Sequence, residues 1–326
     1  MTGLKQQLLA RVEPDLAAIE TALKANLDPH LDLVRQTAGH LMFAGGKRLR
    51  PLLIVLAARI CGREDDFVYR FASIFEFLHT ATLLHDDVID GAAMRRGRPV
   101  AHSIWGAPVT VLVGDFLLAR ALCIAAETEN PEIIRVVSQM TEDISQGEIQ
   151  QLVKKGDINF TEAEYMDVIH RKTGILIQGA CRTGAILGGA DTETEQALTA
   201  YGGHLGLVFQ IADDILDYTA ETGELGKTVG ADLKEGKLTL PVIYALQQAL
   251  PEDRAQMEAI IGNKDFSRDE FQALLVLLHA YGGIEYARRV AGDHVHAAKQ
   301  QIETLAASQT KEILTMMADY ALHRRA

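Results

Sequence analysis

Apolar residues recur at every third or fourth position along most of the chain. Clear examples are "LKQQLLARVEPDLAAIETAL", "YRFASIFEFLHTATLLHDDVID", "EAEYMDVIHRKTGILIQGACRTGAIL", "QALTAYGGHLGLVFQIADDILDYTAE" and "QQIETLAASQTKEILTMMADYAL". This spacing places the apolar side chains on one face of an α-helix, whereas the alternation that is typical of strands is nearly absent. The pattern therefore predicts an all-α fold whose most apolar helices form the inner layer.

Nothing in the sequence divides the chain into separate domains. The eight prolines mostly fall between the helical segments, and there is neither a Ser/Gly-rich linker nor a low-complexity tract. A chain of 326 residues with 48% hydrophobic content can bury one large core. We therefore expect a single domain over residues 1–326, with about ten or more helices of typical length.

Charge and composition argue against several classes of protein. The formal net charge is −12 and no long Lys/Arg run occurs, so we expect no nucleic-acid partner. Cys61, Cys123 and Cys181 are far apart and odd in number, which favours a reducing compartment over a disulfide framework. The N-terminal segment does not resemble a signal peptide, and the most apolar stretches are short or interrupted by residues such as Asp115 and Arg120. These features predict a soluble, cytoplasmic protein without a transmembrane segment.

Two aspartate clusters with the same D-D-x-x-D spacing each end an apolar helical run. They consist of Asp86, Asp87 and Asp90 in "DDVID", and of Asp213, Asp214 and Asp217 in "DDILD". In each motif the first and last aspartates are four residues apart and share one face of a helix. One such cluster can be a solvated helix end, but two matched copies favour a functional site. Carboxylates gathered in an apolar setting repel one another unless cations bind.

The type of ligand atom limits which metal ions the aspartates would bind. Carboxylate oxygens favour Mg²⁺ or Ca²⁺ over zinc, and the EF-hand pattern of a calcium sensor is absent. Mg²⁺ that is held by carboxylates usually keeps open positions, which phosphate oxygens can fill. The clusters therefore predict a phosphate-bearing ligand with basic residues close by.

Basic segments alternate with the aspartate motifs along the chain. They are "GGKRLRP" with Lys47, Arg48 and Arg50, "MRRGRP" with Arg95 and Arg96, "RKTG" with Lys172 and Thr173, and "GKTVGADLKEGK" with Lys227 and Lys237. Each segment alone is more often a solvated loop. The evidence for a functional site is therefore the order in which basic segments and aspartate motifs follow one another along the chain. His79 lies two helical turns before Asp86, and position alone leaves open whether it is a core histidine or a diphosphate contact. Gln210 shares a helical face with Asp213, and no residue pattern suggests a protein nucleophile.

Together these motifs resemble those of the trans-isoprenyl diphosphate synthases. The resemblance rests on "GGKRLRP", "LLHDDVIDGAAMRRGRP", "GDFLLARA", "KTG", "FQIADDILDY" and "GKTVGADLKEGKLTLPVI", which occur in the family's order. The pattern is most similar to the long-chain members, octaprenyl to decaprenyl, that make quinone side chains. The resemblance implies an all-α fold around a central cavity, a homodimer, and a transferase reaction. In that reaction an allylic diphosphate ionises, isopentenyl diphosphate attacks the carbocation, and a proton is lost.

The resemblance also assigns roles to individual residues. The six aspartates are similar to the ligands of about two or three Mg²⁺ ions that hold the allylic diphosphate. The groups that would contact that substrate, farnesyl or geranylgeranyl diphosphate, are Arg95, Lys172, Thr173, Gln210, Lys227 and Lys237. The isopentenyl diphosphate site would comprise Lys47, Arg50, His79 and Arg96. The resemblance is also compatible with a transient contact between the protein and a membrane during product release. Residues 91–93 read Gly-Ala-Ala where many members carry acidic or hydroxyl residues. These positions lie outside the metal-ligand spacing, so the difference affects only the expected detail of the local loop.

Small residues before the first aspartates bear on product length. The growing tail must point away from the metal into the apolar interior, along Leu78, Ala81 and Thr82. Ala81 and Thr82 lie about one turn below Asp86 at roughly 1.5 Å rise per residue. Short-chain members carry aromatic rings near these positions, so small residues favour a long product of about 40 carbons, although close helix packing would also require small residues.

Other functions compete with this interpretation. A terpene cyclase or a phosphohydrolase could use one D-D-x-x-D motif, but it would not need "GGKRLRP" and His79 for a second diphosphate. A non-catalytic subunit of a heteromeric synthase tends to lose aspartates from one motif, and both motifs are complete here. A short- or medium-chain synthase, which makes farnesyl or geranylgeranyl diphosphate, is the remaining alternative.

Overall fold

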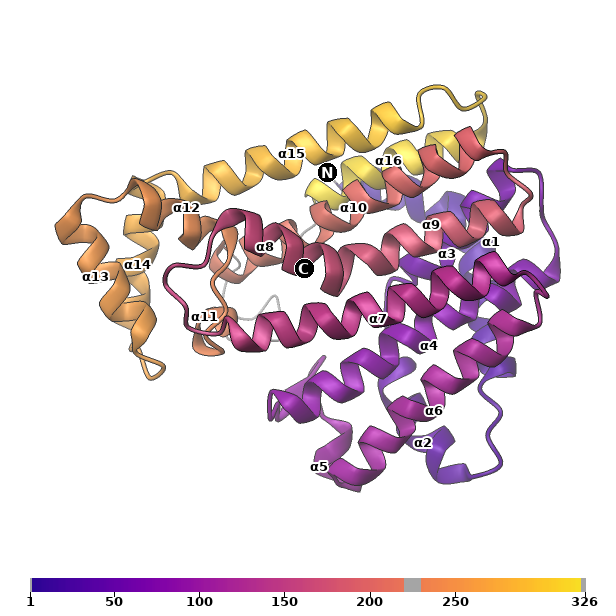
Figure 1. Ribbon diagram of the computed structural model, residues 1–326, viewed down its shortest axis with the longest axis horizontal. Coiled ribbons are helices and arrows are strands. Elements are labelled where there is room, and N and C mark those ends of the chain that lie inside the picture. Colours follow the sequence, from indigo (N-terminus) through magenta and orange to yellow (C-terminus); the bar gives the residue numbers. More distant parts are fainter. Residues whose placement is uncertain (1, 220–229, 324–326) are drawn as a thin grey trace. The chain divides into compact units, whose positions relative to one another are not determined.

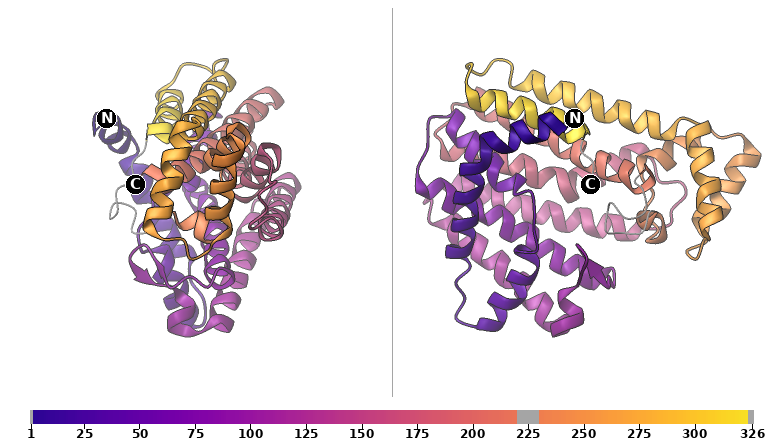
Figure 2. Two further views of the ribbon diagram at one scale, coloured as in Figure 1. Left: turned by 90° about the vertical axis from the view of Figure 1, so that its left-hand side faces the viewer. Right: turned by 180° about the vertical axis from the view of Figure 1, so that it is seen from behind.

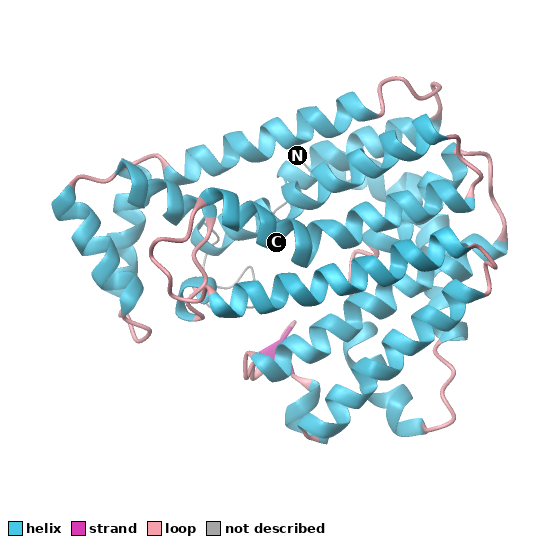
Figure 3. Cartoon of the chain, in the orientation of Figure 1, coloured by secondary structure: helices cyan, strands magenta, loops and turns pink. Residues whose placement is uncertain are grey.

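The structure, a computed structural model, describes residues 2–219 and 230–323 of the chain. Helices dominate these residues, and the strands found there form one two-stranded antiparallel hairpin (Figures 1 and 3). The all-α fold expected from the apolar spacing is confirmed. The described residues divide into two compact units. Unit 1 comprises Met1–Glu142, Leu176–Gly202 and Gln301–Met317, and unit 2 comprises Asp143–Ile175, Gly203–Gln300 and Ala318–Ala326.

Unit 1 contains the N-terminal helices and the hairpin. Its elements are α1 (Thr2–Asn26), α2 (Asp32–Met42), α3 (Leu49–Ile60), α4 (Asp66–Ile89), β1 (Met94–Arg95), β2 (Arg98–Pro99), α5 (Ala101–Trp105) and α6 (Ala107–Ala126). Helices that contribute residues to both units are α7 (Pro131–Val153), α9 (Ile175–Leu187), α10 (Thr192–Thr219), α15 (Gly283–Gln301) and α16 (Gln309–His323). The elements of unit 2 alone are α8 (Glu162–Ile169), the π-helix η1 (His170–Gly174), α11 (Ala231–Lys234), α12 (Leu240–Gln248), α13 (Pro251–Gly262) and α14 (Arg268–Ala280).

Helix α4 forms the centre of unit 1. It begins where the Asp65 side chain accepts a hydrogen bond of 3.0 Å from the Val68 backbone amide, which satisfies one of the open donors of the first turn. Phe71, Phe75 and Phe77 are fully buried along it. Because α4 packs against α1, α3 and α6, apolar residues lie on most of its surface. The right-hand view of Figure 2 shows α1 beside these helices.

Helix α6 is the one helix in the described residues that is long and apolar enough to cross a membrane by length and composition. Of its most apolar 18-residue stretch, 39% is buried within the protein, and α6 packs against α4. A core helix of a soluble protein has the same composition, so α6 is weak evidence for a membrane span.

The core of unit 2 is a separate apolar cluster. Residues of α8, α12, α14 and α15 contribute to it, among them the fully buried Leu240, Leu274, Leu278 and Ile284. Capping boxes start two of its helices, Thr161 with Glu164 at α8 and Ser267 with Glu270 at α14. These reciprocal hydrogen bonds fix where each helix begins.

Candidate active site

The first aspartate cluster occupies the C-terminal end of α4. The Asp90 backbone amide donates to the Asp86 carbonyl at 2.8 Å, so both aspartates belong to the last helical turn. Their side chains are partly exposed, whereas that of Asp87 points inward and the residue is 1% exposed. Asp87 therefore lies in a different environment from Asp86 and Asp90, because the helix directs it away from the solvent.

Asp87 joins α4 to the hairpin. Its Oδ1 accepts a hydrogen bond of 2.7 Å from Arg95 Nε, and its backbone carbonyl accepts from the Ala92 amide at 3.0 Å. The hairpin turns at Arg96 and Gly97, which both have positive φ, so Arg95 returns towards the helix end. Arg95 was expected to contact the allylic diphosphate, and in this structure its side chain is ion-paired with Asp87.

The four residues expected to bind isopentenyl diphosphate lie in unit 1. His79 lies on α4, where protein encloses most of the residue and a smaller part of it remains accessible to solvent. Burial lowers the pKa of His79 well below its usual value of 6.5, and the positive charges of Arg50, Arg96, Arg95 and Arg48 lower it further. These cationic side chains therefore gather around a neutral imidazole, which favours binding of an anion. Lys47 is exposed on the loop before α3, and the Arg96 guanidinium donates to the Gly45 carbonyl of that loop.

The second aspartate cluster lies in α10, within unit 2. Asp213 is exposed, whereas Asp214 is 3% exposed and accepts hydrogen bonds on both carboxylate oxygens. Tyr165 donates to Oδ2 at 2.6 Å, and Gln210 donates to Oδ1 at 2.7 Å. Burial raises the pKa of Asp214 well above its usual range, and the two hydrogen bonds act in the opposite direction.

Asp217 holds the start of α11. Its carboxylate accepts from the backbone amides of Ala231 at 3.1 Å and Asp232 at 3.2 Å, and the residue is 8% exposed. The last aspartate of this motif therefore orders the segment that follows the undescribed residues 220–229. Lys227 lies outside the described residues. Lys237 lies within them, and its ammonium group is ion-paired with Glu235.

Thr173 and Gln210, expected to contact the allylic diphosphate, are hydrogen-bonded to each other. Thr173 Oγ1 donates to Gln210 Oε1 at 2.8 Å, which extends the chain of hydrogen bonds that ends at Asp214. The two helices approach here without side chains between them, because a Cβ added to Gly206 would lie 2.6 Å from the Cα of Gly174. Only glycine fits at such a backbone contact.

Lys172 lies in the π-helix η1. Its Nζ donates to Glu148 at 2.7 Å and to Gln151 at 2.9 Å. π-Helical turns are rare and are frequently found at functional sites. The sequence motif "RKTG" did not indicate this geometry, and the two acceptors on α7 were not predicted.

The expected chain-length residues are on α4. Leu78 is 1% exposed and Ala81 is fully buried. Thr82 is partly buried and donates to the His79 carbonyl at 2.8 Å. The burial of Ala81 is what a position facing the apolar interior requires, and it is equally compatible with close helix packing.

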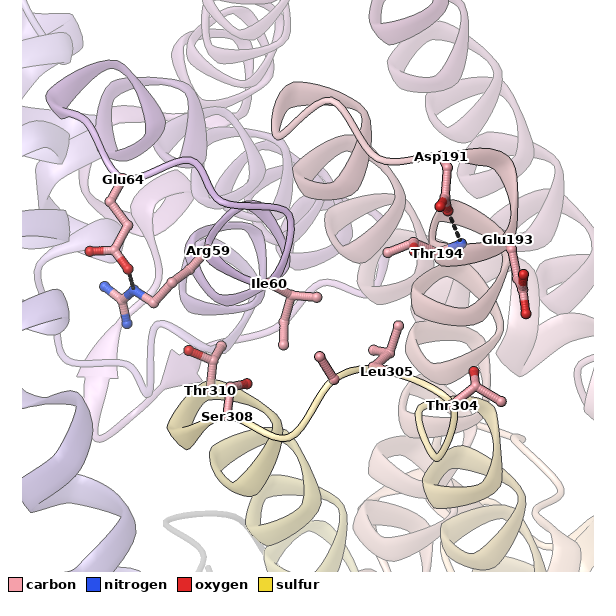
Figure 4. A pocket seen from close by; sticks show the side chains of 11 residues that line it. Arg59, Ile60, Glu64, Asp191, Glu193, Thr194, Thr304, Leu305, Ser308 and Thr310 are labelled. Atoms are coloured by element: carbon pink, nitrogen blue, oxygen red, sulfur yellow. Dashed lines mark hydrogen bonds and ion pairs between the residues drawn. The ribbon is translucent and has the colours of Figure 1, made fainter.

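A pocket of about 550 Å³ in unit 1 lies among other residues (Figure 4). Its lining includes Arg59, Glu64, Asp191, Glu193 and Leu305. None of the residues predicted to bind metal or diphosphate is part of that lining. Arg59 is already ion-paired with Glu64, so this pocket offers no uncompensated cation to a phosphate.

The donor atoms of the aspartate clusters suit a hard divalent cation. Asp86, Asp90 and Asp213 are the less buried members, and their ligand atoms are carboxylate oxygens. Among the described residues, no group of three His, Cys, Asp or Glu side chains is preassembled around a metal position.

Sequence reasoning missed two residues that support the site. Tyr165 and Glu148 hold Asp214 and Lys172, respectively. No spacing rule could have paired them, since Tyr165 and Asp214 are 49 positions apart. Arg95 was predicted as a site residue, but its pairing with Asp87 was not predicted.

Comparison with known proteins gives a consistent match. Residues 31–278 match the family model described as polyprenyl synthetase. Over 310 residues the chain is 37% identical to octaprenyl diphosphate synthase of Escherichia coli (strain K12), covering 95% of this chain and 96% of that protein. It is 38% identical over 289 residues to the short chain isoprenyl diphosphate synthase of Methanothermobacter thermautotrophicus, covering 87% and 88% of the two proteins.

A solved structure matches over nearly the same length. It is that of a polyprenyl synthase from Caulobacter crescentus CB15 complexed with calcium and isoprenyl diphosphate. The TM-score is 0.92 at 38% sequence identity, and the match covers 98% of each chain.

Proposed function

Since the chain belongs to the polyprenyl synthetase family, we propose that it extends an allylic diphosphate with isopentenyl diphosphate to a long all-trans product. The chain is a trans-prenyl diphosphate synthase and thus a prenyltransferase. The proposal adds a length of about 40 carbons, a farnesyl or geranylgeranyl primer, and a quinone side chain as the product's destination. In each cycle the allylic C–O bond breaks and diphosphate leaves with the electron pair. The double bond of isopentenyl diphosphate then forms the new C–C bond, and a proton is lost.

The aspartate motifs are proposed as the metal site for the allylic diphosphate. Family members use divalent metals, and we propose Mg²⁺ for this chain. Asp86, Asp90 and Asp213 would supply ligand oxygens, because their side chains are the more accessible ones. Asp87, Asp214 and Asp217 would act within the same motifs by fixing the hairpin, Gln210 and α11. When bound, divalent ions neutralise charge that develops on the leaving diphosphate.

The basic residues are proposed to divide between two diphosphates. Lys47, Arg50, His79 and Arg96 would bind isopentenyl diphosphate, because the guanidinium groups of Arg50 and Arg96 lie close enough to the His79 imidazole to help lower its pKa. Arg95, Lys172, Thr173, Gln210, Lys227 and Lys237 would serve the allylic diphosphate. Cationic groups that bind the departing diphosphate more strongly than the intact ester lower the barrier to ionisation. Apolar walls would keep water from the carbocation.

Product length is proposed from α4. Leu78, Ala81 and Thr82 precede the aspartates on that helix, and no aromatic ring occupies positions 81 and 82. A tail that leaves the diphosphate towards the helix N-terminus would meet small side chains one turn below the metal. The family match also includes a short-chain synthase, so a shorter product is the alternative.

We also propose a cytoplasmic homodimer, in which the exposed face of α6 meets a second copy of the chain. Val111, Leu112 and Leu122 on that face are 38%, 66% and 41% exposed. Three large apolar side chains along one helix face are typical of an interface core. The charged Asp115 and Arg120 within α6 argue against a membrane span as the reason for this apolar surface.

The single observation that carries the proposal is the pair of D-D-x-x-D motifs, each ending an apolar helix, in a chain of this family. The test is incubation of the purified protein with Mg²⁺, farnesyl diphosphate and radiolabelled isopentenyl diphosphate, followed by thin-layer chromatography of the dephosphorylated product. Product of about 40 carbons is expected, and chelation of the metal should abolish it. Absence of any extractable product would instead indicate a non-catalytic subunit.

A further inference from the structure

One arginine in the basic loop before α3 faces the protein interior. Arg48 stands between Lys47 and Arg50, yet its side chain is only 4% exposed. Its backbone is left-handed, with φ 48° and ψ 33°, and it immediately precedes the first helical residue of α3. This conformation is disfavoured for residues with a Cβ, so surrounding contacts must hold it.

Three hydrogen bonds hold the Arg48 guanidinium. Nε donates to Glu20 of α1 at 2.5 Å, and Nη1 donates to Glu76 of α4 at 2.6 Å. Nη2 donates to the Met42 carbonyl at the end of α2 at 2.8 Å. One side chain therefore fixes the loop to three helices, which a planar guanidinium can do and a lysine ammonium cannot match.

This anchor lies next to the residues proposed to bind isopentenyl diphosphate. Glu76 precedes His79 by three positions and so shares its face of α4. A Cβ added to Gly46 would lie 3.1 Å from Arg48 Nη1 and 3.7 Å from Arg96 Nη1, so both guanidinium groups lie close to Gly46 of the loop.

We propose that Arg48 is a positioning residue for isopentenyl diphosphate. Its ion pairs with the buried Glu76 and with Glu20 hold the loop in the conformation that presents Lys47 to this substrate, and they fix the start of α3, which carries Arg50. This inference rests on the proposed function of that site. Arg48 itself makes no substrate contact, because its guanidinium is directed at two carboxylates and a carbonyl.

The test compares Arg48→Lys and Glu76→Gln with the wild-type protein. We expect KM for isopentenyl diphosphate to rise about tenfold in both variants, with kcat and KM for the allylic diphosphate changed less than about threefold. Calorimetric titration with isopentenyl diphosphate without Mg²⁺ should show the same loss of affinity. Glu76→Gln keeps the side-chain size and the Glu20 contact, so it also provides a test if Arg48→Lys does not fold.

The matched control is Arg59→Lys. Arg59, near the other end of α3, donates to Asp15 of α1 at 2.6 and 3.0 Å, so it too ties α3 to α1 through a buried carboxylate. We expect Arg59→Lys to lower Tm as much as Arg48→Lys while KM for isopentenyl diphosphate stays unchanged. The proposal is overturned if Arg48→Lys and Arg59→Lys have the same KM, or if both substrates are affected equally. A wild-type protein that incorporates no isopentenyl diphosphate would instead refute the proposed function, and the titration would still report on Arg48.

Discussion

The Tyr165 hydroxyl donates a hydrogen bond of 2.6 Å to Asp214 Oδ2, and both residues are buried. Asp214 is the second aspartate of its motif and also accepts from Gln210. Its carboxylate is therefore fixed in orientation from two sides before any ligand binds. Buried groups that orient catalytic residues commonly affect activity by one to two orders of magnitude, although they touch no substrate.

Tyr165→Phe should reduce turnover about tenfold. In the wild-type protein this hydrogen bond stabilises the ionised carboxylate of Asp214. Without it, the pKa of Asp214, already raised by burial, should rise further. Activity should then recover in part as the pH is raised, which a pH–rate profile at saturating Mg²⁺ would detect. Tyr286→Phe is the control, because Tyr286 likewise bonds a carboxylate of unit 2, that of Glu162. Equal profiles for the two variants would contradict the role of Tyr165.

Asp86→Ala and Asp213→Ala should each lower turnover by at least about 100-fold. Both side chains are accessible, so Tm should change little. Asp87→Ala should lower both turnover and Tm, because it leaves the partly buried Arg95 without its partner. Turnover assays and thermal melts of the three proteins would separate these effects. Near-normal turnover of Asp213→Ala would refute a site that needs both motifs.

His79 should make stability depend on pH. Its pKa in the folded protein is lowered, so the unfolded chain binds the proton more readily below about pH 6.5. The wild-type free energy of unfolding should therefore fall as the pH is lowered through this window, by at most about 1.4 kcal/mol per pH unit from this residue. Urea unfolding at several pH values would measure the slope. His79→Gln should have a shallower slope, and identical slopes would mean that His79 titrates normally.

Ala81→Phe should shorten the product to roughly 15–20 carbons, because a ring one turn below Asp86 fills volume that a packed core does not yield. The substitution also adds bulk at a fully buried position, so stability should fall by about 1–3 kcal/mol. Chromatography of the products and a thermal melt would measure both. Ala81→Ser, similar in size, should keep the long product. Unchanged long chains in Ala81→Phe would show that the tail does not pass this residue.

The fold class and the family were accessible from sequence because they depend on periodic and local patterns. Apolar spacing along "YRFASIFEFLHTATLL" is sufficient to predict α4, and D-D-x-x-D is a spacing within one helix. The hairpin around Arg96 was not predicted, because two-residue strands lack a detectable alternation.

The different environments of the aspartates could not be predicted. The helical period places Asp86 and Asp90 on one face, but the inward direction of Asp87 depends on where α4 meets the hairpin. The interior orientation of Arg48 was likewise hidden, since a basic loop of this composition is usually solvated. Both features depend on contacts between residues that are distant in sequence, which the motifs do not contain.

The contact between Gly174 and Gly206 has a consequence for mutational tolerance. Any side chain at position 206 would collide with the backbone of Gly174, and Thr173 and Gln210, which flank this contact, would lose their 2.8 Å hydrogen bond. In a saturation mutagenesis screen we expect Gly206 to tolerate as few substitutions as Asp213, although a glycine has no side chain that could bind metal or diphosphate. Low tolerance at a position therefore does not identify a catalytic group. At Gly206, low tolerance would instead reflect how closely two helix backbones must approach to hold a catalytic group in place.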